Sequence, residues 1–236
     1  MLDTAIILAG GLGTRLKSVI SDLPKPMAPV NGMPFLTYQF RYLKHYGIKK
    51  VILSVGHLAE KIEDYYKSDF EGMNISYAYE KTALGTGGGI RLAIEGCGAN
   101  AILVLNGDSF FDVNIKEFFE QHNAKKSDAS LALRRVDNAA RYGTIQKDDN
   151  NRITLFNEKS GLETPGIING GVYILQKEIY LNNTPRNVTF SIEKDFFEKS
   201  ITKLFLTGFE FNTYFIDIGI PEDYAKAQHD FKEFKY

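Results

Sequence analysis

Four short apolar runs, each followed by a segment of helical character, constrain the fold of this 236-residue chain most strongly. We expect strands at residues 5–8, 51–55, 75–79 and 101–105, and helices from Pro34 to Gly47, over 59–67, over 86–95 and around 115–122. Apolar strands joined by helical crossovers form a parallel sheet that is covered on both faces. The first half of the chain therefore predicts an α/β fold.

The second half carries strand patterns at shorter spacing, at 129–135, 142–147, 152–156 and 168–175. A helix near 191–200, strands near 203–206 and 209–216, and a last helix from Pro221 follow. We expect these elements to extend the same sheet. The prediction is a Rossmann-like mixed, mainly parallel β-sheet with helices on both faces, in one domain over 1–236 with halves 1–125 and 126–236.

The first apolar run leads directly into a glycine-rich loop with a basic end. Three glycines between residues 10 and 13 let the backbone N–H groups turn toward an anion. Arg15 can fork across phosphate oxygens, and Lys25 stands between two prolines that fix its backbone. The spacing is not that of a P-loop, and Leu16 replaces the third glycine of a Rossmann loop. The pattern predicts a polyphosphate site of a different kind.

Acidic side chains follow other strands at the same edge of the predicted sheet. Glu80 ends the third strand, Asp108 follows the fourth, and Asp217 follows the apolar run 214–216. Ligands of parallel α/β sheets bind beyond the carboxyl ends of the strands. We therefore expect Glu80 and Asp108 to lie beside the glycine-rich loop.

The loop, Gly-Gly-x-Gly-Thr-Arg-Leu followed by Pro-Lys-Pro, resembles the signature of the sugar-1-phosphate nucleotidyltransferases, or nucleotide-sugar pyrophosphorylases. The resemblance continues in the family's order through residues 84–88, 106–108, 142–143, 158–159, 169–171 and 216–219. It implies the nucleotide-diphospho-sugar transferase fold. The short length and residues 21–30 are most similar to the members that use D-glycero-D-manno-heptose 1-phosphate and GTP.

The resemblance implies attack of a sugar 1-phosphate on the α-phosphorus of a nucleoside triphosphate, with release of pyrophosphate. A phosphate monoester, with a second pKa of about 6, is already a dianion at neutral pH, so the site must supply positive charge and alignment but no general base. The implied catalytic residues are Arg15, which holds the β- and γ-phosphates, Lys25, near the reacting centre, and Lys159, on the sugar phosphate. Nucleotide binding is implied for Leu8, Gly10, Gly11, Gly13, Thr14, Arg15, Lys25, Glu80, Gly85 and Thr86, and substrate binding for Asn106, Gly143, Glu158, Lys159, Asn169 and Gly170.

Asp108 and Asp217 are the expected ligands of a magnesium ion, Mg²⁺. Each follows a β-prone apolar run. Two carboxylates, phosphate oxygens and waters satisfy an octahedral hard cation. The sequence therefore predicts a magnesium site made by these two residues.

Glu80 predicts the base of the triphosphate. A carboxylate only accepts hydrogen bonds, and guanine offers two adjacent donors, N1–H and N2–H₂. Thymine and uracil offer one donor flanked by carbonyl groups, which a carboxylate repels. In thymidylyl-transferring relatives the matching position resembles a glutamine. We therefore predict GTP as the preferred triphosphate.

Composition limits the partners. The net charge of −1 gives no bulk attraction to nucleic acid or to an anionic membrane, and the single Cys97 fits a reducing cytosol. We find no targeting segment and no apolar run long enough to span a membrane, so we expect a cytoplasmic protein; self-association into a homo-oligomer stays open.

Three alternatives to a heptose enzyme stay open. One is transfer to another sugar, such as mannose or glucose 1-phosphate, with dTTP, UTP or CTP. Another is an enzyme similar to phosphocholine cytidylyltransferase. The last is a nucleotide-binding regulatory subunit, against which the presence of Arg15, Lys25, Asp108 and Asp217 argues.

Overall fold

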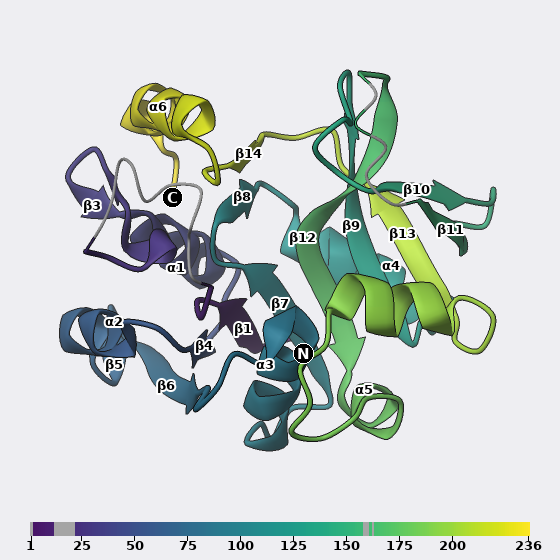
Figure 1. The fold of residues 1–236 in the computed structure, drawn as a ribbon, viewed down its shortest axis with the longest axis horizontal. Helices are drawn as coiled ribbons and strands as arrows, with labels where there is room; N and C mark the ends of the chain where they lie inside the picture. Colours follow the sequence, from purple (N-terminus) through teal and green to yellow (C-terminus); the bar gives the residue numbers. More distant parts are fainter. Residues whose placement is uncertain (1, 12–21, 158–160, 162) are drawn as a thin grey trace.

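One mixed sheet forms the centre of the computed structural model, which describes residues 2–11, 22–157, 161 and 163–236 (Figure 1). Within these residues its ten strands are β1 (Thr4–Leu8), β4 (Lys50–Val55), β5 (Asp69–Phe70), β6 (Met73–Tyr79), β7 (Ala101–Asn106), β9 (Ala129–Val136), β10 (Thr144–Lys147), β11 (Ile153–Asn157), β12 (Gly166–Gln176) and β13 (Leu206–Glu210). Their order is β11-β10-β12-β7-β1-β4-β6-β5, and β9 pairs with both β12 and β13. Two small antiparallel ribbons join β2 (Pro29–Val30) to β3 (Met33–Pro34), and β8 (Ser109–Phe111) to β14 (Phe215–Asp217).

Helices connect and cover these strands. They are α1 (Phe35–His45), α2 (Ala59–Tyr66), α3 (Gly85–Glu95), α4 (Ile115–Lys125), α5 (Lys177–Asn182), α6 (Pro221–Asp230), the π-helix η3 (Ile192–Glu198) and the short 3₁₀ helices η2 (Lys25–Met27) and η4 (Phe231–Glu233). In the described part of the chain, no helix combines the length and the apolar character needed to cross a membrane.

The parallel half of the sheet is built as predicted. Strand β1 pairs in parallel with β4 on one side and with β7 on the other, and β6 pairs in parallel with β4. Side chains alternate along β1, so that Ile7 joins the apolar core that includes α1, and Ile6 joins the core that includes α3. Both faces are therefore buried, which explains why the strand is apolar from Ala5 to Leu8.

The second half extends the same sheet, as expected, through antiparallel pairing of β12 with β7 and of β10 with β12. The strands expected at 203–206 and 209–216 are wrong in their bounds. Lys203 and Leu204 instead close a turn in which both N–H groups donate to Ser200 O. The later apolar run is divided between β13 in the main sheet and β14 in the small ribbon, with exposed residues at 212 and 213 between them.

At the carboxyl ends of the neighbouring strands β1 and β7, the chain leaves toward opposite sides of the sheet. The chain passes from the end of β1 through α1 to β4 on one side, and from the end of β7 through β8 and α4 to β9, beyond β12, on the other. Gly107 N donates to Leu8 O at 3.0 Å, and a Cβ on Gly107 would lie 2.4 Å from that oxygen. Only glycine permits this approach, at the kind of crevice where α/β sheets bind ligands.

Candidate functional site

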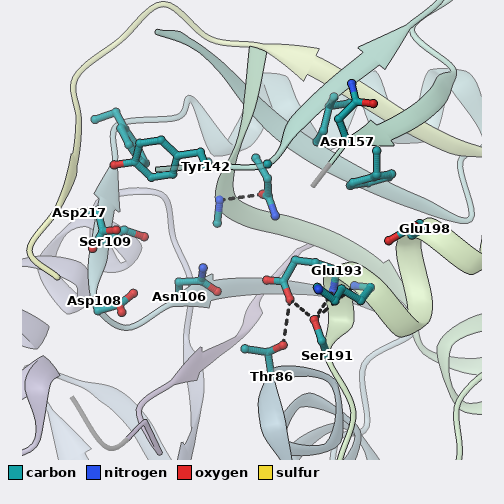
Figure 2. A pocket seen from close by; sticks show the side chains of 18 residues that line it. Thr86, Asn106, Asp108, Ser109, Tyr142, Asn157, Ser191, Glu193, Glu198 and Asp217 are labelled. Atoms are coloured by element: carbon teal, nitrogen blue, oxygen red, sulfur yellow. Dashed lines mark hydrogen bonds between the residues drawn. The ribbon is translucent and has the colours of Figure 1, made fainter. Parts of the chain in front are cut away.

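A cavity of about 680 Å³ lies beside these strand ends, lined by residues from both halves of the chain (Figure 2). Of the residues predicted for the site, those that line it are Thr86, Asn106, Asp108, Gly143, Asn169, Gly170 and Asp217. Figure 2 shows Asp108 and Asp217 on one side of the cavity, and Glu193 and Glu198 on the other. The structure therefore gathers these predicted residues around one space, although they lie far apart in the sequence.

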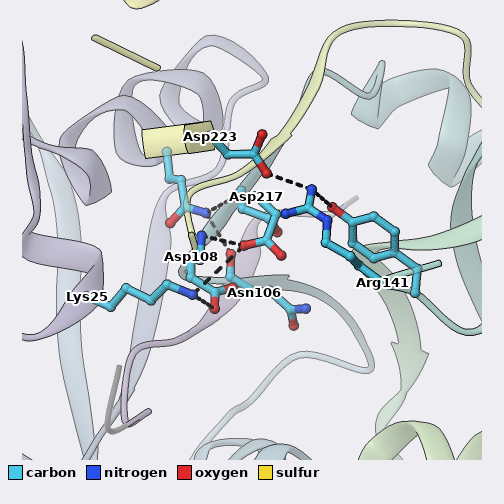
Figure 3. A network of polar contacts seen from close by, with 10 residues as sticks. Lys25, Asn106, Asp108, Arg141, Asp217 and Asp223 are labelled. Atoms are coloured by element: carbon cyan, nitrogen blue, oxygen red, sulfur yellow. Dashed lines mark hydrogen bonds and ion pairs between the residues drawn. The ribbon is translucent and has the colours of Figure 1, made fainter. Parts of the chain in front are cut away.

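Lys25 lies against the two predicted metal ligands (Figure 3). Its Nζ is 2.6 Å from Asp108 Oδ2 and 3.9 Å from Asp217 Oδ1, and its side chain is 12% exposed. Burial, together with the neighbouring charge of Asp108, raises the pKa of Asp217. The three residues form a compact charged cluster, which we call the Lys25 cluster, and its two carboxylates exceed its one cation.

The small ribbon explains how the two aspartates meet. Asp217 is paired with Ser109 in the antiparallel register of β14 and β8, and Ile218 N donates to Asp108 O at 3.0 Å. Asp217 Oδ1 also accepts a hydrogen bond from Gly219 N at 2.8 Å. Backbone pairing thus fixes both carboxylates at one end of the cavity.

The Lys25 cluster fits a hard divalent cation. Its donors are carboxylate oxygens, the ligand type that Mg²⁺ takes from proteins, usually from one or two residues together with phosphate oxygens and water. Among the described residues, no group of three or more His, Cys, Asp or Glu side chains is arranged to hold a metal alone. The geometry therefore suits an ion that shares its coordination with a phosphate ligand.

Glu80 follows β6, and hydrogen bonds hold its carboxylate in place, unlike that of an ordinary surface glutamate. Its Oε1 accepts from Ser54 Oγ at 3.0 Å, and its Oε2 accepts from Leu84 N at 2.9 Å. A Cβ added to Gly10 or to Gly89 would lie 2.7 or 2.8 Å from Glu80 Oε1. The carboxylate thus packs closely against two glycines, one of them from the predicted phosphate loop. Hydrogen bonds from Ser54 and Leu84 hold its two oxygens.

Gly85 and Thr86 contact the segment before and within η3, although we predicted them as nucleotide contacts. Gly85 has a positive φ of 71°, and a Cβ there would lie 2.6 Å from Phe190 O. Thr86 Oγ1 donates to Glu193 Oε2 at 3.0 Å and accepts from Ile192 N at 3.0 Å. Both residues hold η3 against α3, and Thr86 also lines the cavity.

The predicted sugar contact at residues 169–171 is a β-bulge in β12. The register with β9 shifts between Asn169 and Tyr173, and Gly171 has a positive φ of 74°. Asn169 Oδ1 accepts from Gly171 N at 2.9 Å, and its Nδ2 donates to the Tyr173 hydroxyl at 2.7 Å. The amide of Asn169 therefore holds the shape of the bulge that lines the cavity.

Several predicted residues lie outside the cavity lining or outside the described residues. Leu8 O is engaged by the turn after β7, and Gly11 is exposed with open space where a Cβ would be. Those outside the described residues are Gly13, Thr14, Arg15, Glu158 and Lys159. Their roles stay predictions.

Sequence reasoning missed most of the polar wall on the η3 side. The lining residues that it did not assign are Ser109, Ile145, Phe156, Asn157, Ser191, Glu193, Lys194, Glu198 and Phe215. Ser191 Oγ accepts from the backbone N–H groups of Glu193 and Lys194, each at 3.2 Å. Ser191, with Glu193 two residues on, is typical of a helix start, and nothing in that pattern indicates a cavity.

Arg141 is another residue that the sequence did not single out. Its Nη2 donates to Asp223 Oδ2 at 2.7 Å and to the Tyr142 hydroxyl at 3.3 Å (Figure 3). Asp223 lies in the first turn of α6. The guanidinium therefore ties α6 to the loop before β10, next to the Lys25 cluster.

Comparison with known proteins agrees with this geometry. The model of the nucleotidyl transferase family matches residues 4–233. A D-glycero-alpha-D-manno-heptose 1-phosphate guanylyltransferase from Aneurinibacillus thermoaerophilus is 45% identical over 98% of this chain and 99% of its own, and one from Campylobacter jejuni is 46% identical over 93% and 96%. The crystal structure of HddC from Yersinia pseudotuberculosis complexed with GMP-PN has a TM-score of 0.86 and 39% identity, and the match covers 98% of this chain and 100% of that one. The chain therefore belongs to the nucleotidyl transferase family.

Proposed function

We propose that the protein condenses D-glycero-α-D-manno-heptose 1-phosphate with GTP to give the GDP-heptose and pyrophosphate. The near full-length likeness to enzymes of that name supports the reaction. The structural observation that carries the proposal is the Lys25 cluster at one end of a cavity large enough for a sugar phosphate. The alternative acceptors and triphosphates have no comparable support.

The proposed reaction requires a site that supplies positive charge and aligns the two substrates. An oxygen of the sugar phosphate forms a bond to the α-phosphorus of GTP, and the bond from that phosphorus to the pyrophosphate oxygen breaks. Because the sugar phosphate is a dianion above a pKa of about 6, no side chain has to remove a proton from it. Lys25, held at the cavity end, offsets charge where the two anions meet, and Arg15 and Lys159 are proposed to bind the leaving pyrophosphate and the sugar phosphate.

Asp108 and Asp217 are proposed to hold a magnesium ion. The proximity of the two carboxylates to each other and the raised pKa of Asp217 support a place where a cation is favoured. When bound, the ion supplies charge neutralisation to phosphate oxygens and helps to orient them. The chain's own part is to keep both carboxylates and Lys25 within a few ångströms of one another.

Glu80 is proposed to select guanine. Each of its oxygens accepts one hydrogen bond within the protein and keeps a further lone pair. The two contacts hold the carboxylate in one orientation, as bidentate reading of N1–H and N2–H₂ requires. Since the carboxylate rests on Gly10 of the loop, a base read there is close to phosphates bound by the same loop.

We propose that the two halves divide the substrates, with GTP held mainly by residues 1–125 and the sugar phosphate by residues 126–236. The bulge at residues 169–171, Gly143 and Glu193 present polar groups to the cavity and support sugar binding there. The single cysteine, Cys97, is buried and free, which agrees with the cytoplasm as the proposed compartment.

A pyrophosphate-release assay tests the function directly. The purified protein is combined with GTP, dTTP, UTP or CTP and with heptose, mannose or glucose 1-phosphate or phosphocholine. We expect the highest kcat/KM for GTP with the heptose 1-phosphate. No release with any pair would leave a nucleotide-binding subunit, and a preference for another pair would replace the proposed substrates.

A further inference from the structure

Gln39 is a fully buried polar residue in the middle of α1, with no exposed surface. Apart from Thr37, its buried neighbours along this helix are aromatic or aliphatic. Neither the mechanism nor the sequence patterns use Gln39. A buried amide in such a helix calls for an explanation, because burying it is costly unless its hydrogen bonds are made.

The amide nitrogen of Gln39 bridges the two ends of one turn. Its Nε2 donates to Asn106 O at 2.8 Å and to Ser109 O at 2.7 Å. The nitrogen carries two hydrogens, so each carbonyl receives one. Gln39 therefore ties the end of β7 to the start of β8, and the residue pair between the two carbonyls is Gly107 and Asp108.

The oxygen of the same amide makes no hydrogen bond in this position within the described residues. Gln39 Oε1 is buried and has no hydrogen-bond partner among the described residues. An unpaired buried acceptor is a recognised penalty in folded proteins. The side chain thus donates to two carbonyl groups, while its own oxygen stays unpaired. This arrangement favours a role in positioning the turn over a purely stabilising role.

Other contacts fix the turn only in part. Gly107 N is bonded to Leu8 O, and Asp108 O accepts from Ile218 N. These bonds hold the backbone on the side of β1 and of β14. The side that faces α1 is held by Gln39, which completes the restraint around Asp108.

We infer that Gln39 is a positioning residue for the metal site: by bridging Asn106 O and Ser109 O, it keeps the Asp108 carboxylate directed at Lys25 and Asp217. This inference rests on the proposed function, in which Asp108 and Asp217 hold magnesium. Residues that orient metal ligands typically change metal affinity or activity by about 10–100-fold when they are replaced.

The test compares Gln39→Met, which keeps the shape and removes both donors, with Thr37→Val on the same helix. Thr37 is buried and bonds to the Tyr66 hydroxyl at 2.8 Å, so this control also loses one buried hydrogen bond. One readout is the magnesium concentration that gives half the maximal rate. The other is the rise in Tm when magnesium is added to the enzyme with GTP. Asp108→Asn is included to test the metal site itself.

We expect Gln39→Met to raise the half-saturating magnesium concentration by about tenfold or more and to shrink the magnesium-dependent rise in Tm, while Thr37→Val matches the parent. Equal behaviour of Gln39→Met and Thr37→Val would overturn the inference. If Asp108→Asn also matches the parent, the proposed metal site itself fails. Should Gln39→Met not fold, Gln39→Asn, which keeps the amide but shortens its reach, must give a smaller shift in the same direction, and an unchanged magnesium dependence in that variant would overturn the inference.

Discussion

Replacing Glu80 with glutamine tests the selection of guanine, and the structure specifies what the change removes. Leu84 N–H needs an acceptor, so the glutamine oxygen takes the place of Oε2, and its NH₂ group takes the place of Oε1 beside Ser54. The Ser54 hydroxyl can rotate to accept from that group. The variant thus presents one acceptor and one donor to the base, where the parent presents two acceptors.

One of the two guanine donors then loses its acceptor. A hydrogen bond to a charged group contributes about 1.5–3 kcal/mol, which corresponds to a factor of about 10–150 in kcat/KM. The same glutamine matches the adjacent N3–H and carbonyl of uracil. We therefore expect kcat/KM for GTP to fall by about 10–150-fold, and the GTP-to-UTP ratio to fall further.

Pyrophosphate release with GTP, ITP and UTP at saturating sugar 1-phosphate measures this effect. ITP lacks the N2 amino group, so the parent should use it about 10–150-fold less well than GTP. Glu63→Gln is the matched control, because the Glu63 carboxylate also accepts a hydrogen bond, in this case from the hydroxyl of Tyr79, next to Glu80, at 2.6 Å. A parent that prefers dTTP, UTP or CTP would refute the guanine assignment, and an unchanged GTP-to-UTP ratio in Glu80→Gln would refute the role of Glu80.

Three further predictions concern charge. Arg15→Ala is expected to keep the fold and to lower kcat by about 10²–10³, since a charge that stabilises the transition state is lost; parental kcat in the folded variant would contradict this role. Asp108→Asn and Asp217→Asn should each lower activity and raise the magnesium requirement, measured by titrating magnesium in the pyrophosphate assay; parental dependence in both would exclude the carboxylate pair. Burial lowers the pKa of His122 from 6.5 to about 4, so the folded chain binds fewer protons than the unfolded chain. The free energy of unfolding should therefore fall by up to about 3 kcal/mol between about pH 6.5 and pH 4, and urea unfolding should show this loss in the parent but not in His122→Gln.

The sheet edge that borders the site could be predicted, because burial of a strand on both faces gives a continuous apolar run in the sequence. Ile6 and Ile7 contribute to different cores, so the strand is apolar from Ala5 to Leu8. Once four such strands are joined by helices, their carboxyl ends must meet at one edge. Glu80 and Asp108 lie at these ends, just after β6 and β7, as the sequence predicts.

The η3 wall and the support of Asp108 could not be predicted in the same way. Thr86 and Glu193 form a hydrogen bond only after α3 and η3 have packed, and no local pattern marks a contact so distant in sequence. Gln39 reads as an ordinary helix residue, because its role depends on which carbonyls lie opposite it. Local sequence carries periodicity and turn chemistry, whereas these contacts are properties of the assembled tertiary structure.

The charge of the Lys25 cluster couples the binding of the triphosphate to the binding of the divalent cation in the proposed reaction. Two carboxylates and one ammonium leave a formal charge of −1, and the neighbouring Asp108 adds to the rise in the pKa of Asp217. A triphosphate approaching this cluster meets a field of its own sign. A divalent cation at Asp108 and Asp217 would reverse that field, so it must strengthen binding of the triphosphate. By thermodynamic reciprocity the triphosphate would strengthen binding of the cation by the same factor, so the proposed metal site would need only two carboxylates and no complete set of protein ligands.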